Sequence, residues 1–217
     1  AQRCATDEVH REFIKKDPKV AEIQNALDMH LRGAALKTTA VSYQALLDSI
    51  YNDVTKFQAL IPVVVHVVHD YGNEYISDNE IFEMIKNLNR VYAGTNTDLS
   101  SVIAPFKPYI GKAAIEFRLA QKDPQGKPTI GILRHYSYLT YGGDDQAKFN
   151  QWDPSKYLNI WLENKIGRGE PGGEVLAYAT LPAGAANFPY NDGVISGYGH
   201  IDNKKTIEHE VGHYLNL

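Results

Sequence analysis

The sequence predicts an α+β fold, in which a helical first part precedes a part that mixes strands and helices. Up to residue 57, apolar residues recur mainly at helical spacing, whereas from Ile61 onward runs of strand-forming residues are separated by turn residues. The last segment, residues 203–217, is amphipathic and carries two histidines one helical turn apart. We therefore expect a helical segment over residues 1–57 and a sheet-containing domain over residues 58–217.

The composition excludes several classes of protein. The 217 residues are 43% hydrophobic and 22% charged, which suits one domain with an accessory segment. The 22 basic and 26 acidic side chains include no dense Lys/Arg run, so we expect no nucleic-acid partner. The longest apolar run, residues 60–68, is much shorter than the ~20 residues of a membrane-spanning helix. A start at Ala1-Gln2 suits a secreted chain whose signal peptide has been removed.

The first part of the chain contains two helical patterns. Asp17 and Pro18 form an N-cap and first-turn proline for a helix whose apolar stripe is Val20, Ile23, Leu27 and Leu31. A small, polar linker over residues 33–40 follows. A second amphipathic pattern then places five apolar residues at helical spacing: Leu46, Leu47, Ile50, Tyr51 and Val54.

The second part predicts a sheet with one backing helix. Residues 61–68 are dominated by β-branched residues and indicate a central strand. Ser77 and Glu80 have the spacing of a capping box, before a helix with an apolar stripe at Ile81, Ile85, Leu88 and Tyr92. Four further short runs predict strands, at residues 114–119, 157–162, 175–181 and 193–198. The final helix has no Gly or Pro to stop it, so we expect it to reach Leu217 without a C-cap.

The final helix has the side chains of a catalytic zinc site. His209 and His213 lie four residues apart, so both imidazoles can reach one ion, and Glu210 lies beside them. A carboxylate in this position can take a proton from a zinc-bound water that attacks a peptide carbonyl. The alternative is a chance His-Glu-x-x-His on a solvated helix. The apolar stripe of Ile207, Val211 and Leu215 and the preceding strands favour the zinc site.

Residues 209–217 resemble the start of the extended zinc motif of the pappalysin family of metzincin metallopeptidases, His-Glu-x-x-His-x-x-Gly/Asn-x-x-His, with Asn216 at the Gly/Asn position. The resemblance implies a third zinc ligand two residues after Leu217. It also implies a missing lower subdomain, which we expect as a packing partner for Tyr214, Leu215 and Leu217. With only two histidines of the site, we expect the chain itself to be truncated and inactive.

Three other segments resemble the strands of the upper subdomain in that family, namely residues 61–68, 152–161 and 176–182. The resemblance implies a twisted, mixed five-stranded sheet with a backing helix and an active-site helix. It also implies that an edge strand of the sheet pairs with an extended peptide substrate, and residues 176–181 are our candidate for that strand.

Cys4 is the only cysteine in the chain, so it has no intrachain disulfide partner. The run from Gln2 to Thr6 resembles the start of the pro-segment in bacterial members of the family, where a cysteine can hold the zinc of the latent enzyme. A thiolate on zinc would block the position that the attacking water needs. The alternative is an inert thiol on a frayed terminus.

Other polar residues have weaker patterns. His66 lies within the apolar strand, where a hydrogen-bonded core role is more common than metal binding. His69, His135 and His200 fall near predicted turns and are expected at the surface. Asp144, Asp145 and Asp192 carry the oxygen ligands that calcium prefers, but acids in loops are more often simply solvated.

The sequence thus predicts a secreted zinc metalloendopeptidase zymogen, with Glu210 as catalytic base, His209 and His213 as zinc ligands and Cys4 as latch. The alternative is a non-catalytic binding domain that retains a metallopeptidase-like fold, because a fold alone does not establish a function.

Overall fold

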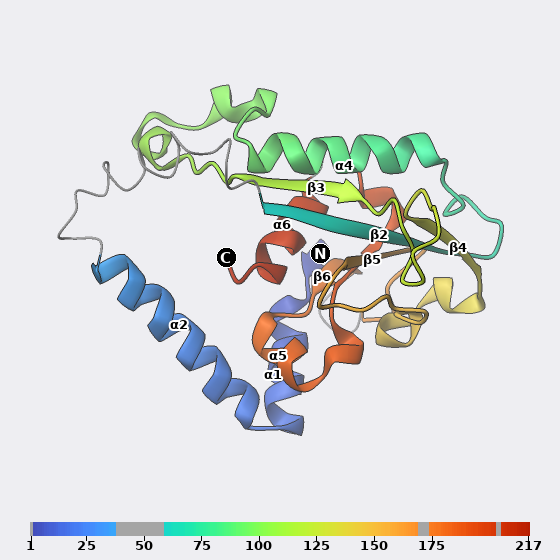
Figure 1. Ribbon diagram of the computed structural model, residues 1–217, viewed down its shortest axis with the longest axis horizontal. Coiled ribbons are helices and arrows are strands. Elements are labelled where there is room, and N and C mark those ends of the chain that lie inside the picture. Colours follow the sequence, from blue (N-terminus) through green and yellow to red (C-terminus); the bar gives the residue numbers. More distant parts are fainter. Residues whose placement is uncertain (1, 38–58, 169–173, 203–204) are drawn as a thin grey trace.

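The computed structural model describes residues 2–37, 59–168, 174–202 and 205–217 (Figure 1). Its strands are β1 (Gln2–Cys4), β2 (Ala59–His69), β3 (Ile115–Leu119), β4 (Ile132–Tyr136), β5 (Leu158–Glu163), β6 (Glu174–Ala179) and β7 (Val194–Gly197). Its α-helices are α1 (Thr6–Lys16), α2 (Lys19–Lys37), α4 (Asp78–Tyr92), α5 (Pro182–Asn187) and α6 (Thr206–Tyr214). None of the helices in the described ranges has the length and apolarity needed to cross a membrane.

All seven strands belong to one mixed sheet, in the order β1-β6-β7-β5-β2-β3, with β4 also paired to β2. Strands β3 and β4 pair with successive halves of β2, and β2, β5 and β7 run parallel to one another. Strand β6 is antiparallel to β7, and β1 is parallel to β6. The N-terminal strand β1 therefore forms one edge of the sheet, next to β6.

Both faces of the sheet are covered. On one face, α4 packs on β3 and α6 packs on β6 and β7. Their buried side chains, among them Ile85, Leu88 and Val211, form one cluster with side chains of β2 and β5. On the other face, Val9 and Phe13 of α1 pack in a second cluster that includes Tyr178 of β6. Strand β2 lies between the two clusters, which explains its continuous apolar sequence, because a strand buried on both faces has no need to alternate with polar residues.

The predicted mixed fold is confirmed, and the five predicted strands correspond to β2, β3, β5, β6 and β7. Strands β1 and β4 were not predicted. Strand β4 contains Arg134 and His135 in its five residues, and β1 has only three residues, so neither has a strand pattern of its own.

The predicted helix starts are also confirmed in detail. Ser77 and Glu80 form both hydrogen bonds of the capping box at the start of α4. The Asp17 carboxylate accepts a hydrogen bond of 3.0 Å from the backbone N–H of Lys19, at the start of α2. The second amphipathic pattern, residues 46–54, lies outside the described residues.

His66 has the core role that its strand position predicts. Its side chain is fully buried, its Nδ1 lies 3.1 Å from His135 Nε2, and its Nε2 lies 3.0 Å from Asn159 Oδ1. The ring stacks on Trp161 with centroids 4.8 Å apart. Burial lowers the pKa of His66 to about 4, since an imidazolium loses its hydration in the core.

This lowered pKa predicts how stability depends on pH. A folded state with neutral His66 binds fewer protons than the unfolded chain below pH ~6.5, so the contribution of His66 to stability is lost as the pH falls from 6.5 toward 4. The loss should approach ~3 kcal/mol in the free energy of unfolding, measured by urea denaturation at each pH. An NMR titration of the His66 ring isolates this residue from the carboxylates, and a midpoint near 6.5 would contradict the prediction.

Candidate metal centre and active site

The two predicted histidine ligands lie on α6, one turn apart. His209 Nε2 and His213 Nε2 are 3.0 Å apart, and their rings are nearly perpendicular, at 82°. His209 is exposed and His213 is half-buried, while Ile207 and Val211 on the opposite side of the helix are buried in the core. The apolar stripe of α6 thus fixes which way the two imidazoles point.

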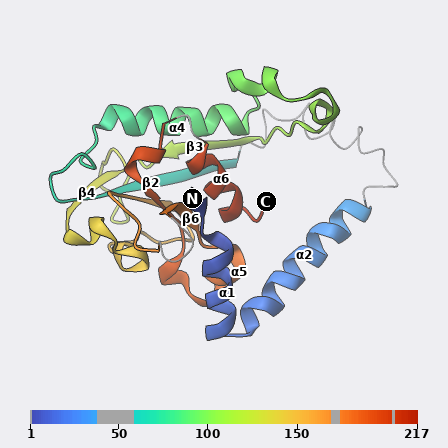
Figure 2. The same ribbon diagram turned by 180° about the vertical axis from the view of Figure 1, so that it is seen from behind.

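Cys4 reaches the same point from the other end of the chain. The β1 register pairs Cys4 with Ala177 of β6, a strand that packs against α6, and the N-terminus lies near α6 in both views (Figures 1 and 2). The Cys4 sulfur and one ring nitrogen each of His209 and His213 lie within 4.8 Å of one another. The predicted proximity of Cys4 to the two histidines is thus present in the structure.

The side chain of Glu210, in α6, is buried against the start of α1. Its side chain is 1% exposed, and its Oε2 accepts hydrogen bonds from the Cys4 thiol at 3.4 Å and from the Thr6 hydroxyl at 3.0 Å. Burial is the main reason that the pKa of Glu210 is raised. Burial and the nearby Glu210 carboxylate together raise the pKa of Cys4 to about 11.

Thr6 is a site residue to which the sequence pattern gave no role of its own. Its hydroxyl donates to Glu210 and accepts a hydrogen bond of 3.0 Å from the backbone N–H of Ala179, in β6. One hydroxyl therefore connects the N-terminal segment, β6 and α6. The sequence alone could not suggest the contact of Thr6 with Glu210, because the contact depends on the pairing of β1 with β6.

The end of α6 corrects one prediction, because the helix stops at Tyr214 rather than continuing to Leu217. Asn216 adopts a left-handed conformation with φ of 64°. The N–H of Leu217 donates to Gly212 O, and the N–H of Asn216 donates to His213 O, each at 2.9 Å. These two bonds form a Schellman motif, for which Gly and Asn are the favoured left-handed residues. The left-handed backbone conformation at this point therefore explains why the motif has Gly or Asn at the position of Asn216.

The start of α6 is held by α4, since the Tyr92 hydroxyl donates a hydrogen bond of 3.2 Å to the carbonyl of Glu208. Leu215 packs against the core, and together with Leu217 and Tyr92 it lines a largely apolar cavity of about 550 Å³. Leu217 itself is 82% exposed, and Tyr214 and Leu215 are half-buried.

The donor set fits zinc. Zinc in proteins prefers four ligands of nitrogen and sulfur, and a tetrahedral ion with nitrogen ligands at ~2.05 Å separates them by roughly 3.3 Å, near the observed 3.0 Å. A thiol with a raised pKa would lose its proton to a bound cation, because the ion stabilises the thiolate. Cys4, His209 and His213 could thus supply three of the four ligands of one zinc ion.

The remaining predicted polar residues lie elsewhere, and two of the expectations for them are wrong, those for His69 and for the pair Asp144 and Asp145. His69 was expected at the surface but is 3% exposed, because its ring is packed among Tyr71, Tyr75 and Tyr136. His135 and His200 are half-buried. His135 belongs to the hydrogen-bonded pair with His66.

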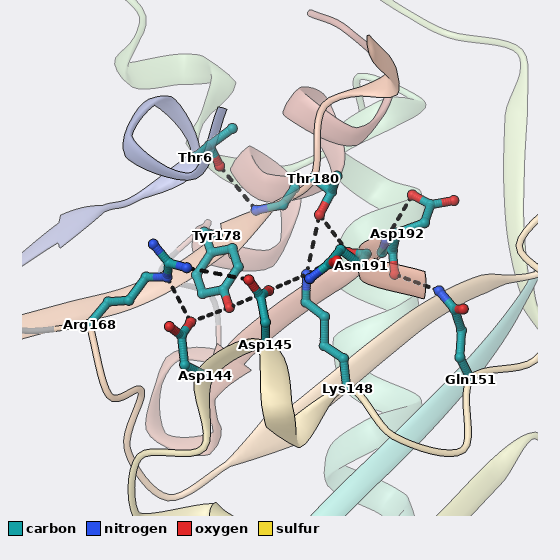
Figure 3. A network of polar contacts seen from close by, with 12 residues as sticks. Thr6, Asp144, Asp145, Lys148, Gln151, Arg168, Tyr178, Thr180, Asn191 and Asp192 are labelled. Atoms are coloured by element: carbon teal, nitrogen blue, oxygen red, sulfur yellow. Dashed lines mark hydrogen bonds and ion pairs between the residues drawn. The ribbon is translucent and has the colours of Figure 1, made fainter. Parts of the chain in front are cut away.

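Asp144 and Asp145 are also not simply solvated, but belong to an ion-pair network beside β6 (Figure 3). Their carboxylates contact Arg168 at 2.7 and 3.3 Å, and both accept hydrogen bonds from the Tyr178 hydroxyl. Lys148, whose ammonium group is buried, lies 3.4 Å from Asp145.

The same lysine ties this network to the chain after β6. It donates to the Thr180 hydroxyl at 3.2 Å and to the carbonyl of Asn191 at 2.8 Å. Asp192 is 9% exposed and accepts a hydrogen bond from the N–H of Gly193. These carboxylates therefore hold the loops around β6 together.

The conformation of Asn216 leads to a testable prediction. Replacing Asn216 with Ala should lower the free energy of unfolding by ~1 kcal/mol, because a Cβ-bearing residue without a local polar side chain is disfavoured in the left-handed region. Asn216→Gly should be close to neutral, measured by urea denaturation. Asn216 also accepts a hydrogen bond from Gln24, so Gln24→Ala is the control for loss of that contact alone. An equal loss in Asn216→Gly and Asn216→Ala would contradict the backbone explanation.

Comparison with known proteins identifies similar solved structures. Mature mirolysin of Tannerella forsythia in complex with a cleaved peptide is 35% identical with a TM-score of 0.68, and the match covers 75% of this chain and 64% of that one. A Glu-to-Ala variant of promirolysin from the same organism is 32% identical with a TM-score of 0.67, covering 85% of this chain and 66% of that one. Mirolysin in complex with a small compound is 36% identical with a TM-score of 0.67, covering 74% and 63%.

This chain therefore spans slightly less than two thirds of the length of each of these proteins. No protein-family model matches it, and a search of curated proteins gives no match. Mirolysin is a metzincin of the pappalysin family, and both its mature and its pro-form share the fold described above. On the sheet, the zinc helix and these similarities, the chain belongs to the pappalysin family of metzincin metallopeptidases.

Proposed function

We propose that the chain is the N-terminal part of a secreted zinc metalloendopeptidase zymogen, with residues 1–57 as pro-segment and residues 58–217 as the upper part of the catalytic domain. The observation that carries the proposal is the convergence of Cys4, His209 and His213 beside the buried Glu210. The proposed substrate is a protein or peptide. Secretion is part of the proposal because of the similarity to mirolysin.

The presence of a pro-segment in this chain, though not its boundary, has support from the comparisons. The match with promirolysin covers 85% of the chain and that with mature mirolysin covers 75%, a difference of ten percentage points. Additional similarity to the pro-form is expected if part of this chain is a pro-segment. Residues 38–58, which include the proposed boundary, lie outside the described residues.

The proposed latent state blocks both the metal site and the strand that would bind substrate. Strand β1 pairs with Glu174, Val175 and Ala177 of β6, so it overlaps the segment 176–181, for which we predicted substrate pairing, at Ala177. Cys4 lies next to the histidine nitrogens, and Thr6 holds the Glu210 carboxylate. Removing the N-terminal segment would free the β6 edge, one zinc ligand position and the carboxylate together.

The chemistry of the open site follows from the residues that remain. Bound zinc would polarise the peptide carbonyl and make water more acidic. Without Cys4 and Thr6, Glu210 would face the space next to the histidines, where it can accept a proton from an attacking water. Two histidines alone are fewer than the three protein ligands of a typical catalytic zinc, so the proposed enzyme needs a further ligand outside this chain.

The first test separates metal binding from catalysis in the full-length, processed protein. We expect about one zinc per chain, severe loss of zinc in His209→Ala and His213→Ala, and retention of zinc in Glu210→Ala. Peptide hydrolysis by Glu210→Ala should fall ~100- to 10,000-fold, since a general base is lost. Elemental analysis and a peptide assay measure the two properties.

His135→Ala is the control, because this histidine is remote from the site and should leave zinc content unchanged. Unchanged zinc in both ligand variants would refute the site. Full zinc occupancy with no peptide hydrolysis in the wild type would favour the alternative, a non-catalytic binding domain with this fold.

The second test concerns the latch in the full-length proenzyme. X-ray absorption should find one sulfur ~2.3 Å from zinc, and Cys4→Ala should remove this signal and raise the basal hydrolysis of peptides. Proteolytic removal of the pro-segment from the wild type provides the comparison, since it should produce activity without any substitution. A proenzyme whose zinc has only nitrogen and oxygen neighbours would refute the latch and leave the peptidase assignment intact.

A further inference from the structure

Arg168 connects the proposed catalytic part with the proposed pro-segment. Its Nε and Nη2 atoms contact Asp144 and Asp145, whereas its Nη1 atom lies 2.8 Å from Glu12 Oε2, in α1 (Figure 3 shows the first two contacts). The Arg168 side chain is only 13% exposed. Two sides of the guanidinium are thus held by the catalytic part, and the third binds a carboxylate that would leave with the pro-segment.

Glu12 is a third carboxylate in contact with Arg168, in addition to Asp144 and Asp145. Asp144 and Asp145 are balanced by Arg168 and the buried Lys148. Tyr178 is neutral, because burial and the two adjacent aspartates raise its pKa well above its ordinary value. The fixed part of the network is therefore already paired without Glu12, and the Nη1 atom of Arg168 remains a charged donor when Glu12 leaves.

The position of Arg168 relates it to a peptide bound on β6. The guanidinium lies over the Tyr178 ring, 5.4 Å from its centroid. Tyr178 directly follows Ala177, which pairs with Cys4, and the next residue of the N-terminal segment, Ala5, is buried in the same cluster as Tyr178. A substrate strand in place of β1 would therefore direct one side chain toward Tyr178 and Arg168.

The departure of α1 would also provide room for that side chain. Val9 and Phe13 are buried in the same cluster as Tyr178, and Phe13 is 2% exposed with its ring stacked on Phe188 at 4.9 Å. Once α1 leaves, the wall of this space is apolar near β6 and cationic at Arg168. A side chain with a methylene stem and a terminal carboxylate matches that order.

Resting on the function proposed above, we propose that Arg168 is a specificity-determining residue, which selects a glutamate side chain at one position of the peptide substrate near the scissile bond. Glu12 occupies this contact in the latent form. Glutamate fits better than aspartate because the carboxylate must reach past the Tyr178 ring from a backbone in the place of β1. The Nη1 donor then makes the same charge-assisted contact with substrate that it makes with Glu12.

The test uses the full-length, processed enzyme with peptide pairs that differ only by Glu or Gln, placed in turn at each position around the cleaved bond. At one position the kcat/KM ratio of Glu to Gln should be about tenfold, the size expected of one charge-assisted hydrogen bond. This ratio should fall to about one in Arg168→Gln and remain above one in Arg168→Lys. Arg118→Gln is the matched control, because Arg118 forms an exposed ion pair with Glu116 on β3 and should keep the preference.

A binding measurement keeps this test independent of catalysis. Fluorescence anisotropy of the same labelled peptides on the zinc-loaded Glu210→Ala variant should show the same preference in Kd, lost when Arg168→Gln is added. Equal affinity and equal cleavage for Glu and Gln at every position would overturn the proposed subsite while leaving the peptidase intact. Preferential binding without any turnover by the wild type would overturn the proposed peptidase and retain the subsite. A preference for Glu that is unchanged in Arg168→Gln would overturn the role of Arg168, because another residue would then be responsible for the preference.

Discussion

The pairing of β1 with the outer edge of β6 is the constraint on which the proposed latent arrangement depends. Three residues of strand place Cys4 beside two histidines that lie more than two hundred positions later, and this register also places Thr6 against Glu210. An unpaired strand edge presents backbone donors and acceptors that readily bind another strand. The edge of β6 is thus suited to bind either the N-terminal segment or an extended peptide, and one ligand excludes the other.

Strand β6 is stabilised by polar contacts from both parts of the chain. The N–H of Ala179 is bound by Thr6, from the N-terminal segment, whereas Thr180 is bound by the buried Lys148. Buried polar groups are costly when unpaired, so each of these contacts restricts where the strand can lie. Because Lys148 belongs to the proposed catalytic part, the end of β6 would keep its support after the N-terminal segment is removed. The edge would then be available to a peptide without rebuilding the strand.

Helix α6 shows how backbone geometry and the proposed chemistry share one short motif. Its apolar side packs Ile207 and Val211 into the core, and its other side presents the imidazoles. Asn216 then turns the chain through a left-handed residue, which ends the helix directly after the second histidine. A helix continuing through Asn216 would carry the following residues along the axis and away from the metal position. The motif therefore specifies both histidines, the proposed ligands, and the point at which the backbone must reverse.

The sequence by itself determined the features that depend on local spacing. The periodic pattern of β2 and of α4, the Ser77 capping box, and the placement of His209 and His213 on one helix face require only neighbours within a few residues. The tertiary structure decided what depends on distant pairing. Strand β1 exists because β6 accepts it, the burial of His69 is completed by Tyr136 from the distant strand β4, and Arg168 meets Glu12 only when α1 lies on the sheet. A hydrogen bond or ion pair between residues far apart leaves no periodic signal in the chain, because its geometry is set by the whole fold.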